Sequence, residues 1–126
     1  MEEGEPRGFG LPRAVRITSS AEIRTLFRRG KRRRTRHLDV FVFASPVAHA
    51  RLGVVVPKHR RRIVERNRLK RRLRELSRTL LLPALEARGL ALDVMLRVRP
   101  EAYTAEFAAL RDEIAQLAEA LCSRAS

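Results

Sequence analysis

The segment from Lys58 to Arg74, KHRRRIVERNRLKRRLR, constrains the fold of this chain more than any other part of the sequence. It holds ten cations and a single acid, Glu65. Within it and just beyond, leucines recur at spacings of four, three and four, at Leu69, Leu73, Leu76 and Leu80. This spacing places the leucines on one face of a helix. The sequence therefore predicts an amphipathic helix that ends at Pro83, with an apolar seam on one side and cations on the other.

The face opposite the leucines indicates what this helix binds. It is formed by Asn67, Lys70, Arg71, Arg74 and Arg78. A solvated helix face usually mixes charges, so that acids and bases pair four residues apart. Here like charges follow one another at that spacing, at Arg66, Lys70, Arg74 and Arg78. Because such pairs destabilise a helix, the pattern favours a surface that binds a polyanion over a plain solvated face.

Charge is distributed unevenly along the chain. The 126 residues include 28 Lys and Arg against 14 Asp and Glu, a formal net charge of +14. Between Arg7 and Arg78 there are 23 basic and four acidic residues, so a polyanionic partner is expected to meet the first two thirds of the chain. A membrane surface is the rival partner, but the chain has no Trp and only 5% aromatic residues, which argues against it. We therefore expect a nucleic acid and no membrane.

The length and composition predict one folded domain. With 44% hydrophobic residues, a chain of this length supplies one core but not two. We expect a mobile tail over residues 1–10 and a folded domain over 11–122. Cys122 is the single cysteine, so it has no partner for an intramolecular disulfide or a CxxC metal site. No signal peptide or spanning segment is apparent, and a cytoplasmic location is expected.

A first helix is predicted over Ser20–Arg29. Ser19 and Glu22 have the spacing of a capping box, and Gly30 is a stop signal. The cations around Gly30, taken alone, are interpreted as a flexible basic loop that contacts phosphates without specificity. They are Arg28, Arg29, Lys31, Arg32, Arg33, Arg34 and Arg36.

Three strands and a last helix complete the predicted elements. Leu38–Ala44 and Arg51–Val56 are rich in β-branched residues, and the short connection between them suggests an antiparallel hairpin. Leu92–Val98 alternates apolar residues with Asp93, Met95 and Arg97, which predicts a sheet with one buried and one polar face. A helix near Thr104–Leu121, with an apolar face that begins at Phe107, is interpreted as a packing element.

A family resemblance rests on three stretches of the chain. VERNRLKRRLRE, Val64 to Glu75, preceded by RLGVVVPK, resembles the RNR motif of the bacterial ribonuclease P protein subunit. Leu11 to Gly30 is similar to the N-terminal stretch of that family, and Leu92 to Ile114 to its last strand and helix. The resemblance implies an α/β fold, a single-domain α+β sandwich of order αβββαβα. It also implies a left-handed βαβ crossover that carries the RNR helix, although most such crossovers are right-handed.

The resemblance also implies a function in tRNA processing. Proteins of this family are accessory subunits of a ribonucleoprotein endonuclease, in which a catalytic RNA with its Mg²⁺ ions removes the 5′ leader of precursor tRNA. The partners implied are that catalytic RNA and the precursor tRNA leader, and no DNA. The protein alone is expected to hold no cofactor and to have no nuclease activity.

The resemblance implies two sets of binding residues. The motif positions that would contact the catalytic RNA are Arg66, Asn67, Arg68, Lys70, Arg71 and Arg74. The positions that would line a cleft for the single-stranded leader are Phe27, Phe41, Ile23, Arg36 and Lys58. On the sequence alone, either Phe is as well explained as a core residue. Ile23 stands where the family commonly has a Phe, and it can pack against a base but cannot stack on it. The Gly-x-Ala-Val stretch that usually precedes the motif is replaced by Arg61 to Val64.

Two other functions are weighed against this one. An independent enzyme is not favoured, because His37, His49 and His59 are scattered and few acids accompany the cations, so we predict no catalytic and no metal-binding residues. The alternative that composition leaves open is a ribosomal or RNA-chaperone-like binding protein with no part in a reaction. A DNA-reading basic helix would need a dimerisation heptad, and Pro83 argues against one.

Overall fold

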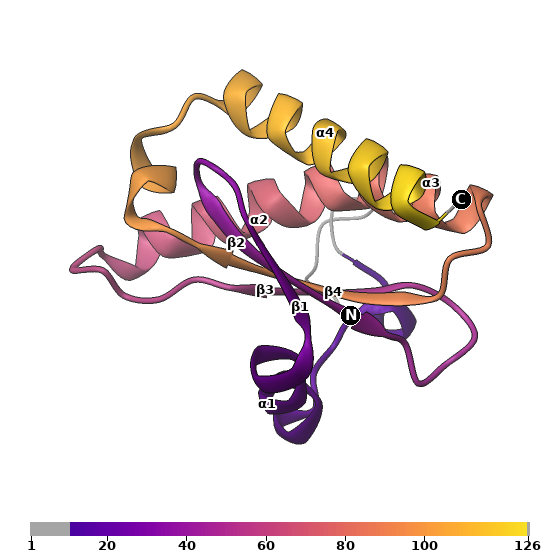
Figure 1. Ribbon diagram of the computed structural model, residues 1–126. Coiled ribbons are helices and arrows are strands. Elements are labelled where there is room, and N and C mark those ends of the chain that lie inside the picture. Colours follow the sequence, from indigo (N-terminus) through magenta and orange to yellow (C-terminus); the bar gives the residue numbers. More distant parts are fainter. Residues whose placement is uncertain (1–10, 126) are drawn as a thin grey trace.

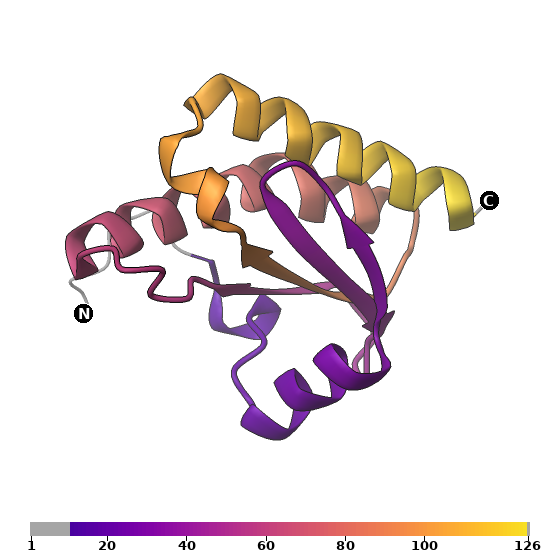
Figure 2. The ribbon, with the colours of Figure 1, turned by 60° about the vertical axis from the view of Figure 1, so that its left-hand side comes forward.

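The computed structural model describes residues 11–125, and it is an α/β sandwich built on one four-stranded sheet. The strands follow the order β1-β2-β4-β3. One face of the sheet is covered by α2, α3 and α4, and the other face carries α1 (Figures 1 and 2). The tail predicted over residues 1–10 lies outside the described residues.

The first helix has the bounds that the sequence predicts. Helix α1 spans Ser20–Arg29, and the Ser19 hydroxyl accepts the Glu22 N–H. The Glu22 carboxylate does not return this bond to complete a capping box; it accepts instead from Arg51 at 3.1 Å. Gly30 ends the helix with a φ of −69°, so it is not in the left-handed region. A Cβ at Gly30 would lie 2.5 Å from the Leu26 carbonyl oxygen, and this close approach is what requires glycine.

The arginine-rich stretch after α1 is a strand and not a flexible loop. Strand β1, Lys31–Arg34, pairs antiparallel with β2, Leu38–Ala44. The predicted hairpin between β2 and β3, Arg51–Val55, is wrong. Strand β4, Leu92–Val98, lies between those two strands, antiparallel to β2 and parallel to β3. The β3–α2–β4 segment is therefore the crossover that the resemblance implies, and this pairing cannot be read from the short β2–β3 connection.

The prediction of one polar sheet face is also wrong, because α1 covers part of it. The core below α2–α4 contains Leu96 and Val98, as the alternation predicts. On the opposite face, however, Met95 is fully buried and belongs to a second apolar cluster beneath α1. Asp93 on the same face is buried too, and it accepts two hydrogen bonds from Arg51, at 2.9 and 2.7 Å. A buried carboxylate paired in this way needs no exposure to solvent.

The long basic helix does not end at Pro83. Helix α2 spans Ile63–Leu76, a π-helical turn follows over Ser77–Leu81, and α3 spans Leu82–Ala87. Pro83 lies in the first turn of α3, directly after the π-helical turn, and the helical run continues through it. The helical run ends instead at Gly89, which has a φ of +66°.

The last helix starts later than the sequence predicts. A 3₁₀ turn occupies Pro100–Thr104, and α4 spans Phe107–Ala125. Phe107 is exposed, so the apolar seam of α4 begins at Leu110. That seam packs in the same core cluster as the leucines of α2, which confirms α4 as a packing element.

Candidate nucleic-acid interface

The basic side of α2 forms the first candidate surface. Leu69, Leu73 and Leu76 are buried, so the helix is held by the seam that the spacing predicts. The six predicted RNA-contacting residues of this helix are called the RNR ridge: Arg66, Asn67, Arg68, Lys70, Arg71 and Arg74. Asn67, Arg68 and Arg71 are exposed, and the other three are half-buried. The fold therefore displays the whole ridge along one rigid element.

Like charges crowd along the centre of the ridge. Burial lowers the pKa of Lys70 below its ordinary value, and the neighbouring Arg74 and Arg66 guanidinium groups lower it further. At the end of this row, Arg78 donates two hydrogen bonds to Glu75, at 3.1 and 2.7 Å. Like charges therefore crowd most closely around Lys70, and a row of phosphates would relieve their repulsion.

The chain enters α2 through a tight turn, which is held in place by contacts with Tyr103. His59 and Arg60 have φ values of 45° and 61°, and the Arg61 N–H donates to the Lys58 carbonyl at 2.7 Å. Tyr103, in the 3₁₀ turn after β4, donates its hydroxyl to the Pro57 carbonyl at 3.1 Å. The Arg61 guanidinium lies 4.9 Å from the centre of the Tyr103 ring. Left-handed backbone at two residues that are not glycine is strained, and this clamp holds it.

The second candidate surface lies beside α1. Ile23, Phe27 and Phe41, called here the aromatic cluster, pack together between α1 and the sheet. The Phe27 and Phe41 rings meet edge to face, with centroids 4.9 Å apart. Phe41 is only 6% exposed, which makes it a core residue, whereas Phe27 is half-buried.

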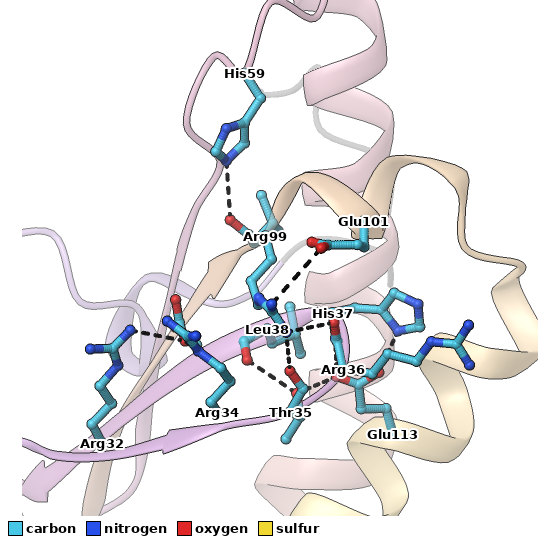
Figure 3. Close-up of polar contacts among 12 residues, drawn as sticks. Arg32, Arg34, Thr35, Arg36, His37, Leu38, His59, Arg99, Glu101 and Glu113 are labelled. Atoms are coloured by element: carbon cyan, nitrogen blue, oxygen red, sulfur yellow. Dashed lines mark hydrogen bonds and ion pairs between the residues drawn. The ribbon is translucent and has the colours of Figure 1, made fainter.

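Two arginines lie against the rings of this aromatic cluster, and one of them shares an acid with a third arginine. The Arg97 guanidinium lies 5.7 Å from the centre of the Phe27 ring, and Arg32 lies 5.8 Å from that of Phe41. Arg32 and Arg34 both contact the Asp39 carboxylate, at 3.3 and 3.0 Å (Figure 3). Burial raises the pKa of Asp39, but the hydrogen bonds from Arg34 and Arg32 outweigh it, and the net shift is downward. These arginines are held in place by a buried acid.

Two of the five predicted leader residues lie away from the aromatic cluster. Arg36 is in the β1–β2 turn, on the side of α4 (Figure 3). Lys58 follows β3 at the entrance of α2 and is exposed. The structure thus brings Ile23, Phe27 and Phe41 together, and it leaves these two cations outside that group.

Comparison with known proteins gives one consistent result. The family model for ribonuclease P matches residues 11–122. A ribonuclease P protein component from Ralstonia pickettii is 40% identical over 116 residues, which cover 86% of this chain and 79% of that protein. One from Kocuria rhizophila is 38% identical and covers 84% of this chain and 87% of its own length. The chain belongs to the ribonuclease P protein family. This confirms the resemblance and assigns the chain to the protein subunits of ribonuclease P, a ribonucleoprotein of tRNA processing, rather than to ribosomal or chaperone-like proteins.

Solved structures agree on the fold of this family. The ribonuclease P protein of Staphylococcus aureus superposes with a TM-score of 0.68 at 25% identity, covering 79% of this chain and 88% of that one. The protein from Thermotoga maritima gives a TM-score of 0.68 at 21% identity, covering 81% and 93%. Within residues 11–125, no helix is long and apolar enough to cross a membrane.

The sequence did not point to all of the residues around the aromatic cluster. The alternation along β4 correctly predicts that Arg97 points away from the α2–α4 core. Its position against Phe27 depends on how α1 packs, and the sequence does not predict that packing. Arg32 and Arg34 were assigned to a loop, because a run of four cations has no apolar alternation to mark a strand. Their partner Asp39 lies in the next strand, β2. No local signal connects these residues, since only strand pairing brings them together.

Proposed function

We propose that the RNR ridge binds the catalytic RNA of ribonuclease P. The observation that carries this proposal is the crowding of like charge around Lys70, on a helix whose other face is fixed in the core. A folded chain that keeps cations so close, with few acids among them, gains when phosphates approach. The guanidinium groups suit phosphate oxygens, which they can bind in pairs.

The surface beside α1 is proposed to bind the 5′ leader of precursor tRNA. Phe27 is the ring available for base stacking, which contributes about 1–3 kcal/mol per base. Phe41 and Ile23 support Phe27 from below, since they pack in the same cluster. Arg32 and Arg97 lie against its rings, and these two, together with Arg34 beside Asp39, would hold the leader phosphates. Arg36 and Lys58, which lie away from the aromatic cluster, are proposed as additional RNA contacts.

Cleavage itself is proposed to belong to the RNA. Within residues 11–125 no group of three or more His, Cys, Asp or Glu side chains could hold a metal ion. We therefore propose that the catalytic RNA supplies the Mg²⁺ sites, that the protein acts as an accessory subunit through residues 11–122, and that it is inactive alone. Neither DNA nor a membrane is proposed as a partner, and the cytoplasm is the proposed location.

The test is cleavage of a 5′-extended precursor tRNA at low Mg²⁺ by the cognate catalytic RNA, with and without the protein. Arg68→Ala/Arg71→Ala removes two exposed ridge cations, and Arg88→Ala/Arg111→Ala removes two exposed cations elsewhere as a charge-matched control. The protein is expected to restore cleavage, the ridge variant to lose that effect and the control to keep it. Equal behaviour of the two variants would contradict the role of the ridge. Cleavage by the protein alone would contradict RNA catalysis.

A further inference from the structure

A pocket lies between the β1–β2 turn and α4, away from the RNR ridge and the aromatic cluster, and Arg36 is part of its lining. Its volume is about 530 Å³, within the range of small-molecule sites. The strand side contributes two cations, Arg33 and Arg36. Helix α4 contributes polar and apolar side chains, namely Ala109, Asp112, Glu113, Gln116 and Leu117.

The walls of this pocket are fixed by hydrogen bonds between the β1–β2 turn and Glu113 of α4. His37 is only 6% exposed, and its Nδ1 lies 2.6 Å from Oε1 of Glu113 (Figure 3). The other carboxylate oxygen of Glu113 accepts the His37 N–H at 3.0 Å and also the Thr35 hydroxyl. Arg99 donates from Nη1 to the Thr35 and Arg36 carbonyls, each at 2.9 Å. The turn and the helix are therefore locked together, and the pocket exists before any ligand arrives.

The lining has opposite chemistry on its two sides. Both oxygens of Glu113 are occupied by the turn, so the polar α4 groups left to meet a ligand are the exposed Asp112 and Gln116. The β1 strand and the turn after it contribute Arg33 and Arg36 to the lining, and α4 also contributes the apolar Ala109 and Leu117. Asp112 lies 3.8 Å from the Arg111 Nε at the surface, and its carboxylate can still accept hydrogen bonds from a ligand, which a bare phosphate would not supply. The pocket suits a ligand with an anion at one end, a flat body, and hydrogen-bond donors at the other end.

The position of the pocket on β1 suggests how such a ligand arrives. Side chains alternate along a strand, and Arg32 and Arg34 contact Asp39 on the α1 side. Arg33, between them, lines the pocket on the α4 side. An RNA strand that crosses the outer edge of β1 would therefore meet arginines on both faces. One of its bases could turn inward, as unstacked bases of single-stranded RNA do at protein sites.

We propose that this pocket binds one unstacked ribonucleotide, with its phosphate on Arg33 and Arg36 and its base edge on Asp112 and Gln116. Guanine is the base that fits best, because its N1–H and N2–H₂ groups donate to a carboxylate while its O6 accepts from an amide. Uracil offers a single ring N–H between two acceptors, and Asp112 would repel those acceptors. This inference rests on the proposed function of the chain as an RNA-binding protein.

The test measures the binding of labelled five-nucleotide RNAs to the full-length protein, comparing UUGUU with UUUUU. The intact protein is expected to prefer UUGUU by about tenfold, in line with one good base-specific contact. Ala109→Trp fills the pocket and is expected to abolish the preference. Ala108→Trp places the same side chain on the neighbouring exposed position, outside the lining, and is expected to keep it. Asp112→Asn should reduce the preference, and thermal unfolding confirms that each variant is folded.

The outcomes separate the two proposals. If neither RNA binds and the catalytic RNA does not bind either, the proposed function fails, and the pocket proposal fails with it. If both RNAs bind equally well, or if Ala109→Trp keeps the preference, only the pocket proposal is overturned. Repeating the comparison with precursor tRNA and with the catalytic RNA identifies the source of the nucleotide. The source is the RNA whose affinity falls in Ala109→Trp and not in Ala108→Trp.

Discussion

The RNR ridge on α2 and the strand β1 are both runs of arginine, yet their surroundings in the fold differ. Around Lys70 the neighbours are cations, and they lower its pKa. On β1, Arg32 and Arg34 converge on the buried Asp39, whose pKa they lower in turn. Charge density in a sequence therefore does not tell how a cation will be used. On the ridge, like charges repel one another around Lys70, whereas on β1 two guanidinium groups are oriented and partly neutralised by Asp39.

The largest effect should come from the seam beneath the ridge. Leu73 is fully buried, and Leu73→Ala should lower the free energy of unfolding by about 2–5 kcal/mol, because it leaves a cavity in the core. Arg71→Ala, on the exposed side of the same helix, should change it by less than about 0.5 kcal/mol. Urea unfolding of both variants measures the difference. Similar losses would mean that the ridge contributes to the fold itself and not only to binding.

The second largest loss of stability is expected when Asp39, the acid that pairs with the arginines of β1, is replaced. Asp39→Asn should lower the free energy of unfolding at pH 7 by about 1–3 kcal/mol, since the bonds from Arg32 and Arg34 lose their charged acceptor. The matched control is Glu75→Gln, which removes the half-buried ion-pair partner of Arg78 on α2 and should cost under about 1 kcal/mol.

The contact of Asp39 with Arg32 and Arg34 should also make the stability of the protein depend on pH. The folded-state pKa of Asp39 is lowered from 3.8, so its contribution is complete above that pH and is lost as the pH falls through the lower folded-state value. Urea midpoints measured between pH 7 and pH 2 should fall less in Asp39→Asn than in the intact protein. Parallel curves for the two proteins would show that Asp39 does not stabilise the arginines of β1.

The RNR ridge and strand β1 also differ in how far the sequence alone predicts them. Helix α1, strands β2 and β4 and the α2 seam were predictable, because capping residues and apolar spacing are local signals. The ridge was predictable for that reason, since its members lie within nine positions of one helix. Strand β1 and its link to Asp39 were not, because the run of cations has no alternation and the pairing is set by the sheet. The bond between His37 and Glu113 joins residues 76 positions apart, and no pattern in either segment announces it.

A smaller effect concerns the turn that delivers α2 to its position. Arg60 has a φ of 61°, and Arg60→Gly should raise the free energy of unfolding by about 0.5–1 kcal/mol, because glycine removes the left-handed strain at some cost in unfolded-state entropy. Arg62, with a φ of −69°, has no such strain, so Arg62→Gly should not stabilise the protein. Thermal unfolding at several salt concentrations separates this backbone effect from the loss of one charge. A gain of equal size in both variants would trace the effect to charge alone.

The smallest expected change in stability comes from Lys70→Gln, and it tests most directly whether the RNR ridge and β1 differ. Lys70→Gln removes a charge that sits one helical turn from both Arg66 and Arg74, and each such like-charge pair costs about 0.2–0.5 kcal/mol. The variant should therefore be slightly more stable than the intact protein at pH 7, while its affinity for the catalytic RNA falls. Because the folded-state pKa of Lys70 is lowered from 10.5, the cost of its charge is complete below that lowered pKa, declines as the pH rises above it and is gone above pH 10.5, and so is the gain.

Salt provides the control for Lys70→Gln, because at 1 M the screening length is about 3 Å and the repulsion along the helix is largely removed. The stability gain should then vanish, whereas Arg34→Gln, which removes a partner of Asp39, should destabilise the protein at low salt. If Lys70→Gln destabilises the chain as Arg34→Gln does, the ridge is held by internal pairing like that of β1. The contrast between the two arginine-rich regions would then be lost. If it stabilises the chain and weakens RNA binding, the crowding on α2 is a property that the fold maintains for its RNA partner.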